Sequence, residues 1–252
     1  MSFTLRQRIP LEKKKIIKAT GKGWTHMKDI ILYHGSRWGL EGDIAPSSRA
    51  KTDFGKGFYL GTNDYQAKGI ISNESDGVFY TVKLRLSEIP ENKILVLSGQ
   101  DWLYTILAKR KKCKEFSQLS IAQDYLDLVN NYDVIIGPIA DDRMNTCFKR
   151  FIENALTDEG LEACLKSVDY GKQYVLKTPF ACSKVDIISS YEMTEEEKHS
   201  IQTHNYNLQL DGDKVVRNAV IAYRNQGLYL DQIIAKEQEL QNNREIDDYE
   251  RE

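Results

Sequence analysis

The sequence has 252 residues, of which 41% are hydrophobic and 29% are charged, and its formal net charge is −2 at pH 7. This length fits one large domain or a domain with an appendage, and this composition excludes a wholly disordered chain. The near-neutral charge excludes a global electrostatic preference for nucleic acid or membrane and leaves only local clusters to act.

The cysteines and the N-terminal segment bear on metal sites and on location. Cys113, Cys147, Cys164 and Cys182 are widely spaced and include no C-x-x-C pair. This pattern indicates neither zinc nor a disulfide framework, and it fits a reducing cytosol. The first 18 residues are basic and lack the roughly seven or more consecutive apolar residues of a signal peptide, and no later run is long enough to span a membrane. We therefore expect a cytoplasmic protein without a metal, or one released without a cleavable signal.

Strands and helices are expected to alternate along the chain. Runs rich in Ile, Val, Leu and Tyr predict strands over residues 30–34, 57–60, 78–84, 94–97, 132–136, 172–177 and 185–191. Helical spacing predicts helices over residues 11–19, 63–71, 144–154, 157–168, 194–207 and 216–223, with two more between 100 and 130. The highly charged tail from Lys236 onward is expected to be mobile unless a partner orders it.

Residues 32–62 form the stretch around which the other elements are organised. A strand-like run ends at His34, and the glycine that follows it lets a ligand approach the backbone closely. A second run carries Tyr59 directly after the turn-forming residues 53–56. A lone histidine at a strand end is more often structural than functional, so neither motif is informative alone. Together they predict a nicotinamide-dinucleotide pocket that His34 faces and in which Tyr59 is a stacking platform.

The two motifs, HGSR at residues 34–37 and FGKGFYLGT at residues 54–62, resemble the opening motifs of the ADP-ribosyltransferase superfamily. The likeness is to the poly(ADP-ribose) polymerase and diphtheria-toxin-like branch, and uncharacterised bacterial proteins share the same motif pair. IAP at residues 44–46 adds to the resemblance. It implies an α+β fold with an ADP-ribosyltransferase-like split β-sandwich core and surrounding helices. We expect a catalytic domain over residues 1–192 and a C-terminal helical extension with a charged mobile tail over residues 193–252.

The resemblance also implies roles for individual residues. His34 would form a hydrogen bond with the adenosine ribose of NAD, which is the expected substrate. The backbone of Gly35 would pair with the nicotinamide amide, and Ser36 would assist at the ribose. Tyr59, next to the loop glycine Gly57, would stack on nicotinamide or shape its pocket, because aromatic contacts add about 0.5 to 1.5 kcal/mol beyond burial.

The third element of the family is a glutamate near the start of a later strand. In this chain KQYVLKT at residues 172–178 resembles that strand, and Gln173 stands in the glutamate position. Ile70 stands where many polymerase-type members have a second stacking tyrosine. Glutamine accepts a hydrogen bond but carries no negative charge and is not a base. This favours a mono-ADP-ribosyltransferase over chain elongation, and it leaves open a slow enzyme or a site in which Asp141 or Asp142 supplies the acidic group. Capping of the following helix is the alternative role for either aspartate.

The acceptor of ADP-ribose is not indicated by the motifs. The densest basic run begins with Lys109, Arg110, Lys111 and Lys112, and it has two open roles, contact with a phosphate-rich acceptor or a solvated helix end. The resemblance implies a macromolecular acceptor, which is protein, RNA or DNA. It also implies a bacterial toxin, effector or antiviral defence protein, with a neutralising antitoxin or immunity partner and no membrane.

Two alternative functions use the same fold. One is a catalytically silent module that binds a nucleotide or nucleic acid, and release of nicotinamide separates it from the enzyme. The other is an NAD hydrolase, which is recognised by free ADP-ribose without a labelled macromolecule.

Overall fold

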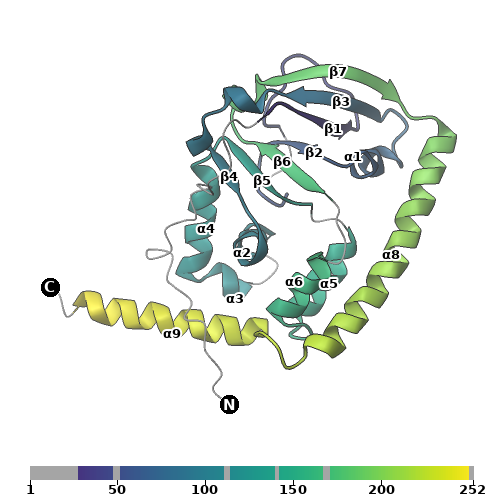
Figure 1. Ribbon diagram of the computed structural model, residues 1–252. Helices are drawn as coiled ribbons and strands as arrows, with labels where there is room; N and C mark the ends of the chain where they lie inside the picture. Colours follow the sequence, from purple (N-terminus) through teal and green to yellow (C-terminus); the bar gives the residue numbers. More distant parts are fainter. Residues whose placement is uncertain (1–27, 48–51, 111–113, 140–141, 167–170, 250–252) are drawn as a thin grey trace.

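The computed structural model of the chain describes residues 28–47, 52–110, 114–139, 142–166 and 171–249. Within these residues, strands form one mixed sheet, and most of the helices lie below it and to its right in Figure 1. The expected α+β fold is therefore confirmed. The helix expected over residues 11–19 lies outside the described residues, as do Asp141, Lys111 and Lys112.

The strands follow the order β4-β5-β6-β2-β1-β3-β7 across the sheet. Only β4 and β5 are parallel, and the other neighbouring strands run antiparallel. The strand bounds are β1 Ile30–Ser36, β2 Phe58–Gly61, β3 Val78–Leu84, β4 Ile94–Val96, β5 Val134–Pro138, β6 Lys172–Leu176 and β7 Val185–Glu192.

The helices cluster between β4 and β6 in the sequence and again after β7. Their bounds are α1 Asp64–Ile71, α2 Gly99–Arg110, α3 Lys114–Ser117, α4 Ser120–Asn130, α5 Asp142–Ile152, α6 Asp158–Lys166, α7 Pro179–Cys182, α8 Glu195–Tyr223 and α9 Leu230–Tyr249. Short 3-10 turns cover Leu86–Glu88 (η1) and Glu91–Lys93 (η2).

The sheet is weakest between β1 and β2. These strands are registered only at Tyr33 opposite Gly61, whereas β1 pairs with β3 along its whole length. Figure 1 shows β1, β3 and β7 grouped at the top of the view, above β2, β6, β5 and β4. We call the narrow β1–β2 junction the seam, and His34 lies beside it.

The two faces of the sheet bury different apolar clusters because side chains alternate along each strand. On the face that we call the helix face, Tyr59 and Val175 pack with Trp102 of α2 and with residues of α4, α5, α6, α8 and α9. On the opposite face, which we call the loop face, Phe58 and Tyr174 pack with residues of η1 and α7 and with the segment around Leu40. Both faces of β5 are buried, which explains its uninterrupted apolar run.

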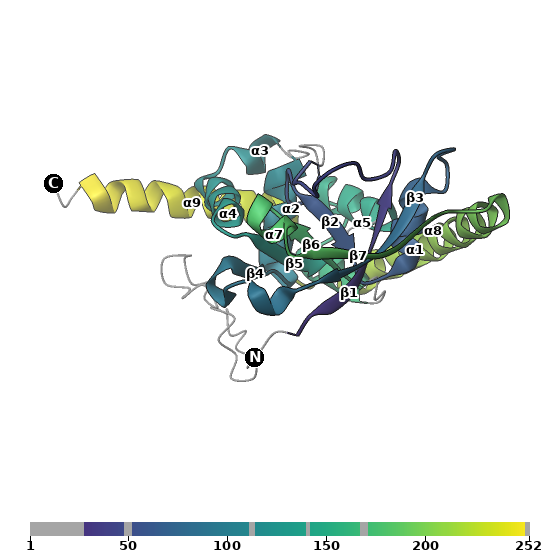
Figure 2. The ribbon, with the colours of Figure 1, turned by 90° about the horizontal axis from the view of Figure 1, so that it is seen from above.

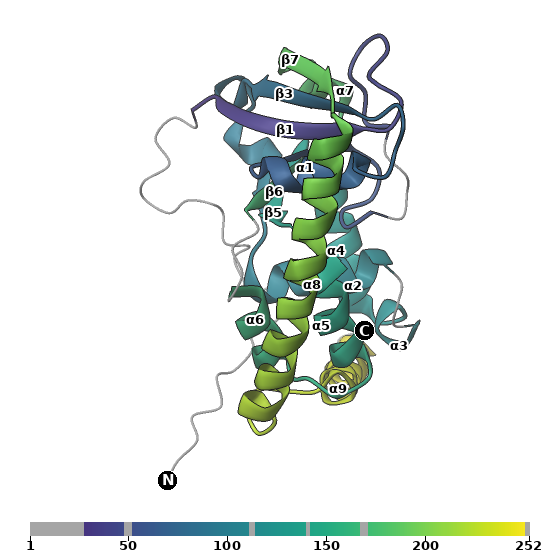
Figure 3. The ribbon, with the colours of Figure 1, turned by 90° about the vertical axis from the view of Figure 1, so that its right-hand side faces the viewer.

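The C-terminal helices differ from the sequence-based prediction. Helix α8 is one continuous helix of 29 residues that passes through Gly212, where two helices were expected. It begins with a capping box between Thr194 and Glu197. In its second half, Val216 and Ala219 are buried. Figure 3 shows α8 lying along α5 and α6, which it contacts. These contacts are long-range in sequence, so local spacing alone did not reveal them.

Helix α9 continues to Tyr249, where composition favoured a mobile tail. Leu230 and Ile233 anchor its first turn in the core, and Gln241 accepts a hydrogen bond from the backbone N–H of Ser120. Most of its other residues are good helix formers. Figure 2 shows the far end of α9 extending away from the sheet.

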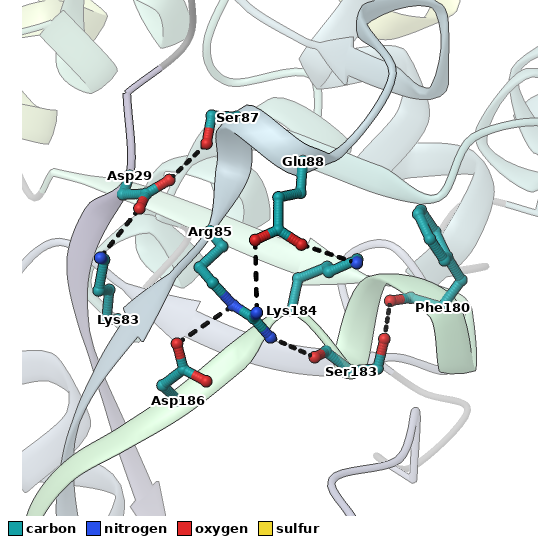
Figure 4. A network of polar contacts seen from close by, with 9 residues as sticks. All are labelled: Asp29, Lys83, Arg85, Ser87, Glu88, Phe180, Ser183, Lys184 and Asp186. Carbon is teal, nitrogen blue, oxygen red and sulfur yellow. Dashed lines mark hydrogen bonds and ion pairs between the residues drawn. The ribbon is translucent and has the colours of Figure 1, made fainter.

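An exposed network of charged side chains joins the start of β1 to the end of β3 and the start of β7 (Figure 4). Its ion pairs include Lys83 with Asp29 at 3.0 Å and Lys184 with Glu88 at 2.8 Å. Hydrogen bonds from Ser87 and Lys83 lower the pKa of Asp29, and the hydrogen bond from Lys184 lowers the pKa of Glu88. We call this set the edge network; its members are Asp29, Lys83, Arg85, Ser87, Glu88, Ser183, Lys184 and Asp186.

Candidate functional site

The three strands that carry the predicted site residues are consecutive in the sheet, in the order β6-β2-β1. Gly61 of β2 pairs with Tyr33 on one side and with Gln173 on the other. His34, Tyr59 and Gln173 therefore come from three neighbouring strands, although they are far apart in sequence.

The His34 ring is held by the backbone of β2. Its Nδ1 lies 2.8 Å from the carbonyl oxygen of Tyr59. A carbonyl has no proton to give, so Nδ1 carries the hydrogen and donates it, which leaves Nε2 as an acceptor. Burial lowers the pKa of His34 and outweighs the opposing effect of this hydrogen bond. The imidazole is therefore neutral at pH 7, with its tautomer set by the Tyr59 carbonyl.

The side chains of His34 and Tyr59 leave the sheet on opposite faces. The His34 ring lies on the loop face, with its centroid 4.4 Å from that of Phe58 and 6.2 Å from that of Tyr80. Tyr59 packs on the helix face. One site lined by both side chains was expected. In the structure they lie on opposite faces of the sheet, and the contact between the two residues is the hydrogen bond from the His34 ring to the Tyr59 carbonyl.

The Tyr59 hydroxyl is enclosed by the loop that precedes β2. It donates to the Gly55 carbonyl at 2.7 Å, accepts from the Phe54 N–H at 3.1 Å and lies 2.8 Å from the Thr52 hydroxyl. Gly55 has a φ of +77°, a backbone conformation that favours glycine. The hydroxyl thus fixes the loop, and the half-buried ring packs against the apolar cluster of the helix face.

Two motif glycines are explained by packing within the chain. A Cβ on Gly35 would lie 2.1 Å from the Ala67 carbonyl oxygen of α1, and one on Gly57 would lie 2.6 Å from the side chain of Val175. Ser36 donates to the Gly39 carbonyl at 2.6 Å, and Ile70 is 47% exposed on α1. Close approach of α1 and β6 is therefore a sufficient reason for both glycines, and the predicted ligand contacts of Gly35, Gly57 and Ser36 stay predictions.

Gln173 is 4% exposed and has a defined amide orientation. Its Nε2 donates to Asp53 Oδ2 at 3.1 Å and to the Pro138 carbonyl at 2.9 Å. Neither partner has a proton to give, so both amide hydrogens point at them and Oε1 faces the other way. Its neighbours across the sheet, Gly61 and Gly137, carry no side chains.

Asp53 contacts a predicted site residue and was not itself among the candidates. It is 8% exposed and bonds to Gln173, which is 120 residues away in sequence. From the sequence, Asp53 was expected only as part of the turn before β2. The available signal was an acidic residue directly before the buried Phe54, but nothing in the spacing indicated its partner.

The basic run begins beside the loop before β2, residues 53–56, which we call the motif loop. A Cβ on Gly55 would lie 3.5 Å from Lys109 Nζ and 3.6 Å from Lys177 Nζ. Lys177 Nζ also donates to the Phe54 carbonyl at 2.7 Å. Burial, and then the charge of Lys109, lower the pKa of Lys177 to about 8. Lys109 is thus distant in sequence from the motif loop but close to it in space.

The rival acidic residues are not placed by the structure. The backbone of Asp142 begins α5, but its side chain is outside the described set, as are Asp141 and the side chain of Arg110. Within the described part of the chain, no three His, Cys, Asp or Glu side chains gather as a metal site would need, and no helix is long and apolar enough to cross a membrane.

Comparison with known proteins gives one family. Searches of curated proteins and of solved structures yield no match. The model of the family described as Protein of unknown function (DUF3990) matches residues 30–187, which is more than half of the chain. The match begins with β1 and ends within β7, so it contains every strand that carries a predicted site residue and leaves out α8 and α9. The chain therefore belongs to this family, the proteins of unknown function DUF3990.

Proposed function

We propose that this protein is an NAD-dependent mono-ADP-ribosyltransferase. The observation that carries the proposal is that the strands with HGSR, FGKGFYLGT and KQYVLKT, which resemble three elements of that superfamily, are consecutive in one sheet. Strands β1 and β2 follow each other in the sequence, and such strands often pair, but β6 is far from both in the sequence, so sequence proximity does not account for its place beside β2.

The reaction exchanges one bond at the nicotinamide ribose. The bond between C1′ and the nicotinamide nitrogen breaks, and nicotinamide leaves with the electron pair while positive charge develops on the ribose ring. A nucleophilic atom of the acceptor then bonds to C1′, and its proton is released to solvent. The products are the ADP-ribosylated acceptor, nicotinamide and one proton.

The described side chains suit this reaction in different ways. His34 offers Nε2 as an acceptor for a ribose hydroxyl, because Nδ1 is occupied by the Tyr59 carbonyl. Gln173 offers Oε1 for the second ribose, because its two N–H groups are bound. A dinucleotide has two riboses joined by a flexible diphosphate, so we assign one ribose to His34 at the seam and the other to Gln173, which lies across β2 from the seam.

Transfer of a single ADP-ribose is favoured over chain growth. Ile70 is an exposed aliphatic residue of α1 in the position of the second stacking tyrosine, and Gln173 supplies no base. A bacterial toxin, effector or defence role, with a neutralising partner, is the biological setting that we propose from the resemblance.

The test is incubation of the protein with NAD labelled in the adenosine half, with cell lysate as the source of acceptor. We expect nicotinamide release together with label on a macromolecule, and digestion with protease, RNase or DNase identifies the acceptor class. His34→Ala should abolish both signals, whereas Lys184→Gln in the edge network should preserve them. A wild-type protein that releases no nicotinamide would contradict the proposal.

The silent binding module has one observation in its favour. The Tyr59 hydroxyl and the Gln173 amide hydrogens are all engaged within the chain. Calorimetry with NAD discriminates, because a silent module binds NAD without releasing nicotinamide. A hydrolase would release nicotinamide and free ADP-ribose in equal amounts and leave every macromolecule unlabelled.

A further inference from the structure

We propose that Asp53 is a positioning residue of the candidate site and supplies, through Gln173, the negative charge that glutamine lacks. In this arrangement two residues replace the single glutamate of the ADP-ribosyltransferases. They are an amide that contacts the ribose and a carboxylate behind the amide. The inference rests on the proposed function, because the charge matters where the ribose becomes cationic.

The first step is the shared burial of the pair. Asp53 is 8% exposed and Gln173 is 4% exposed, and they are joined at 3.1 Å. A buried carboxylate is retained where the chain gives it partners, and the Gln173 amide is one such partner. The pair is therefore a buried polar contact between the loop before β2 and strand β6.

The second step is the geometry of the amide. Asp53 and the Pro138 carbonyl accept both hydrogens of Nε2. If the amide flipped, its Oε1 would face these two oxygen atoms, which is unfavourable. Asp53 thereby keeps Oε1 on the side away from itself. Its charge also polarises the amide, which raises the electron density on Oε1.

The third step concerns the loop that carries Asp53. The Tyr59 hydroxyl holds this loop at Gly55, and Lys177 holds it at the Phe54 carbonyl. The ammonium groups of Lys109 and Lys177 lie beside Gly55, two residues after Asp53. These contacts hold the two residues that follow Asp53, and with them the loop from which its carboxylate reaches Gln173.

An exchange of the two side chains tests the pair. Gln173→Glu alone would set two carboxyl groups at hydrogen-bond distance, and the pKa of one of them would rise because like charges oppose ionisation. Asp53→Asn together with Gln173→Glu again gives one carboxyl group and one amide. The carboxylate then stands at position 173, where the ADP-ribosyltransferases have their glutamate.

The experiment measures nicotinamide release by the wild type, Asp53→Asn, Gln173→Glu and the exchanged double variant from pH 5 to 9. Asp53→Asn should lower kcat by about tenfold or more and change KM by less than about twofold, since the lost charge acts on the transition state. Gln173→Glu should be impaired above the raised pKa of its carboxyl pair. The exchanged variant should recover activity to within about tenfold of the wild type and lose that pH dependence. An unchanged kcat in Asp53→Asn, or an exchanged variant no better than Gln173→Glu, would overturn the inference.

A second measurement needs no activity and covers variants that fold poorly. The raised folded-state pKa in Gln173→Glu means that its unfolding free energy falls as pH rises from the ordinary carboxyl value of about 4.3 through the raised value. Its Tm should therefore drop between pH 5 and 8 relative to the wild type, and the exchanged variant should not show this drop. Parallel Tm curves for the two variants would reject the pairing. An inactive wild type would reject the proposed function and with it the positioning role of Asp53, whereas an active wild type with unaffected Asp53 variants would reject the inference alone.

Discussion

Two polar networks among the described residues, the edge network and the Asp53–Gln173 pair, use similar groups in opposite surroundings. The edge network has several formal ion pairs, but its side chains are exposed or half-buried, such as Glu88 at 42% and Lys184 at 20% (Figure 4). The Asp53–Gln173 pair has a single formal charge and is almost fully buried. Exposed ion pairs contribute little because water and salt screen them, whereas a buried hydrogen bond to a charged group is worth about 1.5 to 3 kcal/mol. The contribution of each network to stability therefore depends on its burial and not on its number of charges.

The networks also differ in what they join. The edge network ties three strands of one half of the sheet, β1, β3 and β7, at an end that carries no predicted site residue. The buried pair ties the motif loop to β6, next to Tyr59 and across the sheet from the seam. Changes in the buried pair should alter function and stability together, and changes in the edge network should alter stability alone.

The largest expected effect is on activity. Gln173→Ala should lower nicotinamide release by about 10² to 10³ with little change in NAD affinity, because it removes one preorganised hydrogen-bonding group at the ribose. Glu88→Gln in the edge network should stay within about twofold of the wild type. Steady-state kinetics and calorimetry with NAD measure the two quantities. Full activity of Gln173→Ala, together with loss in Asp141→Ala or Asp142→Ala, would assign the third site group to an aspartate instead.

The next effect is on stability and isolates burial from catalysis. Gln173→Leu keeps the volume of the side chain but removes the donor to Asp53 and to the Pro138 carbonyl. The free energy of unfolding should fall by about 1.5 to 3 kcal/mol. Urea unfolding at pH 7 measures it, with Lys184→Met as the matched exposed control. Equal losses in the two variants would remove the distinction between the networks.

A smaller effect is a pH dependence that arises at the motif loop. The folded-state pKa of Lys177 is about 8, below its ordinary value of 10.5. Between these values the unfolded chain binds the proton and the folded chain does not, so the unfolding free energy of the wild type rises with pH across this window. Lys177→Met lacks this rise. The stability of the variant relative to the wild type should therefore decline from pH 8 to 10.5, and urea unfolding at several pH values measures the change. A constant difference would show that Lys177 is not desolvated.

The contrast between the networks also explains which features the sequence revealed. Periodicity predicted β1, β3, β5 and β7 because each alternates or is apolar throughout, and the helix expected over residues 63–71 is α1, which Asn63 caps. The helix expected from residue 194 is the first part of α8, which begins with the capping box at Thr194. These are local signals, carried by residues within one element.

Features that depend on long-range pairing could not be predicted in the same way. The Asp53–Gln173 contact depends on the β2–β6 register, and no local pattern records it. The opposite facing of His34 and Tyr59 follows from the register of Tyr33 with Gly61 at the seam. No helix was expected over the first turns of α9, because Leu230 and Ile233 are anchored by residues from other helices and local spacing does not record these contacts. The motifs located the candidate residues, and the sheet order determined which of them are neighbours.

The smallest expected effect comes from the edge network and shows its dependence on acid and salt. The folded-state pKa of Asp29 is lowered by hydrogen bonds from Ser87 and Lys83, so this carboxylate contributes stability above its ordinary pKa of 3.8 and loses it as pH falls through the folded value. Asp29→Asn should therefore lower Tm slightly at pH 7, and the difference from the wild type should vanish in acid below the folded pKa. Added salt should shrink the difference at pH 7, because exposed charges are screened within about 10 Å at 0.1 M. Thermal unfolding at two salt concentrations measures this, and Gln173→Leu should keep its full deficit in both, since its lost hydrogen bonds are shielded from solvent. A salt-dependent deficit in Gln173→Leu would mean that solvent reaches the Asp53 carboxylate, and burial would then no longer separate the two networks.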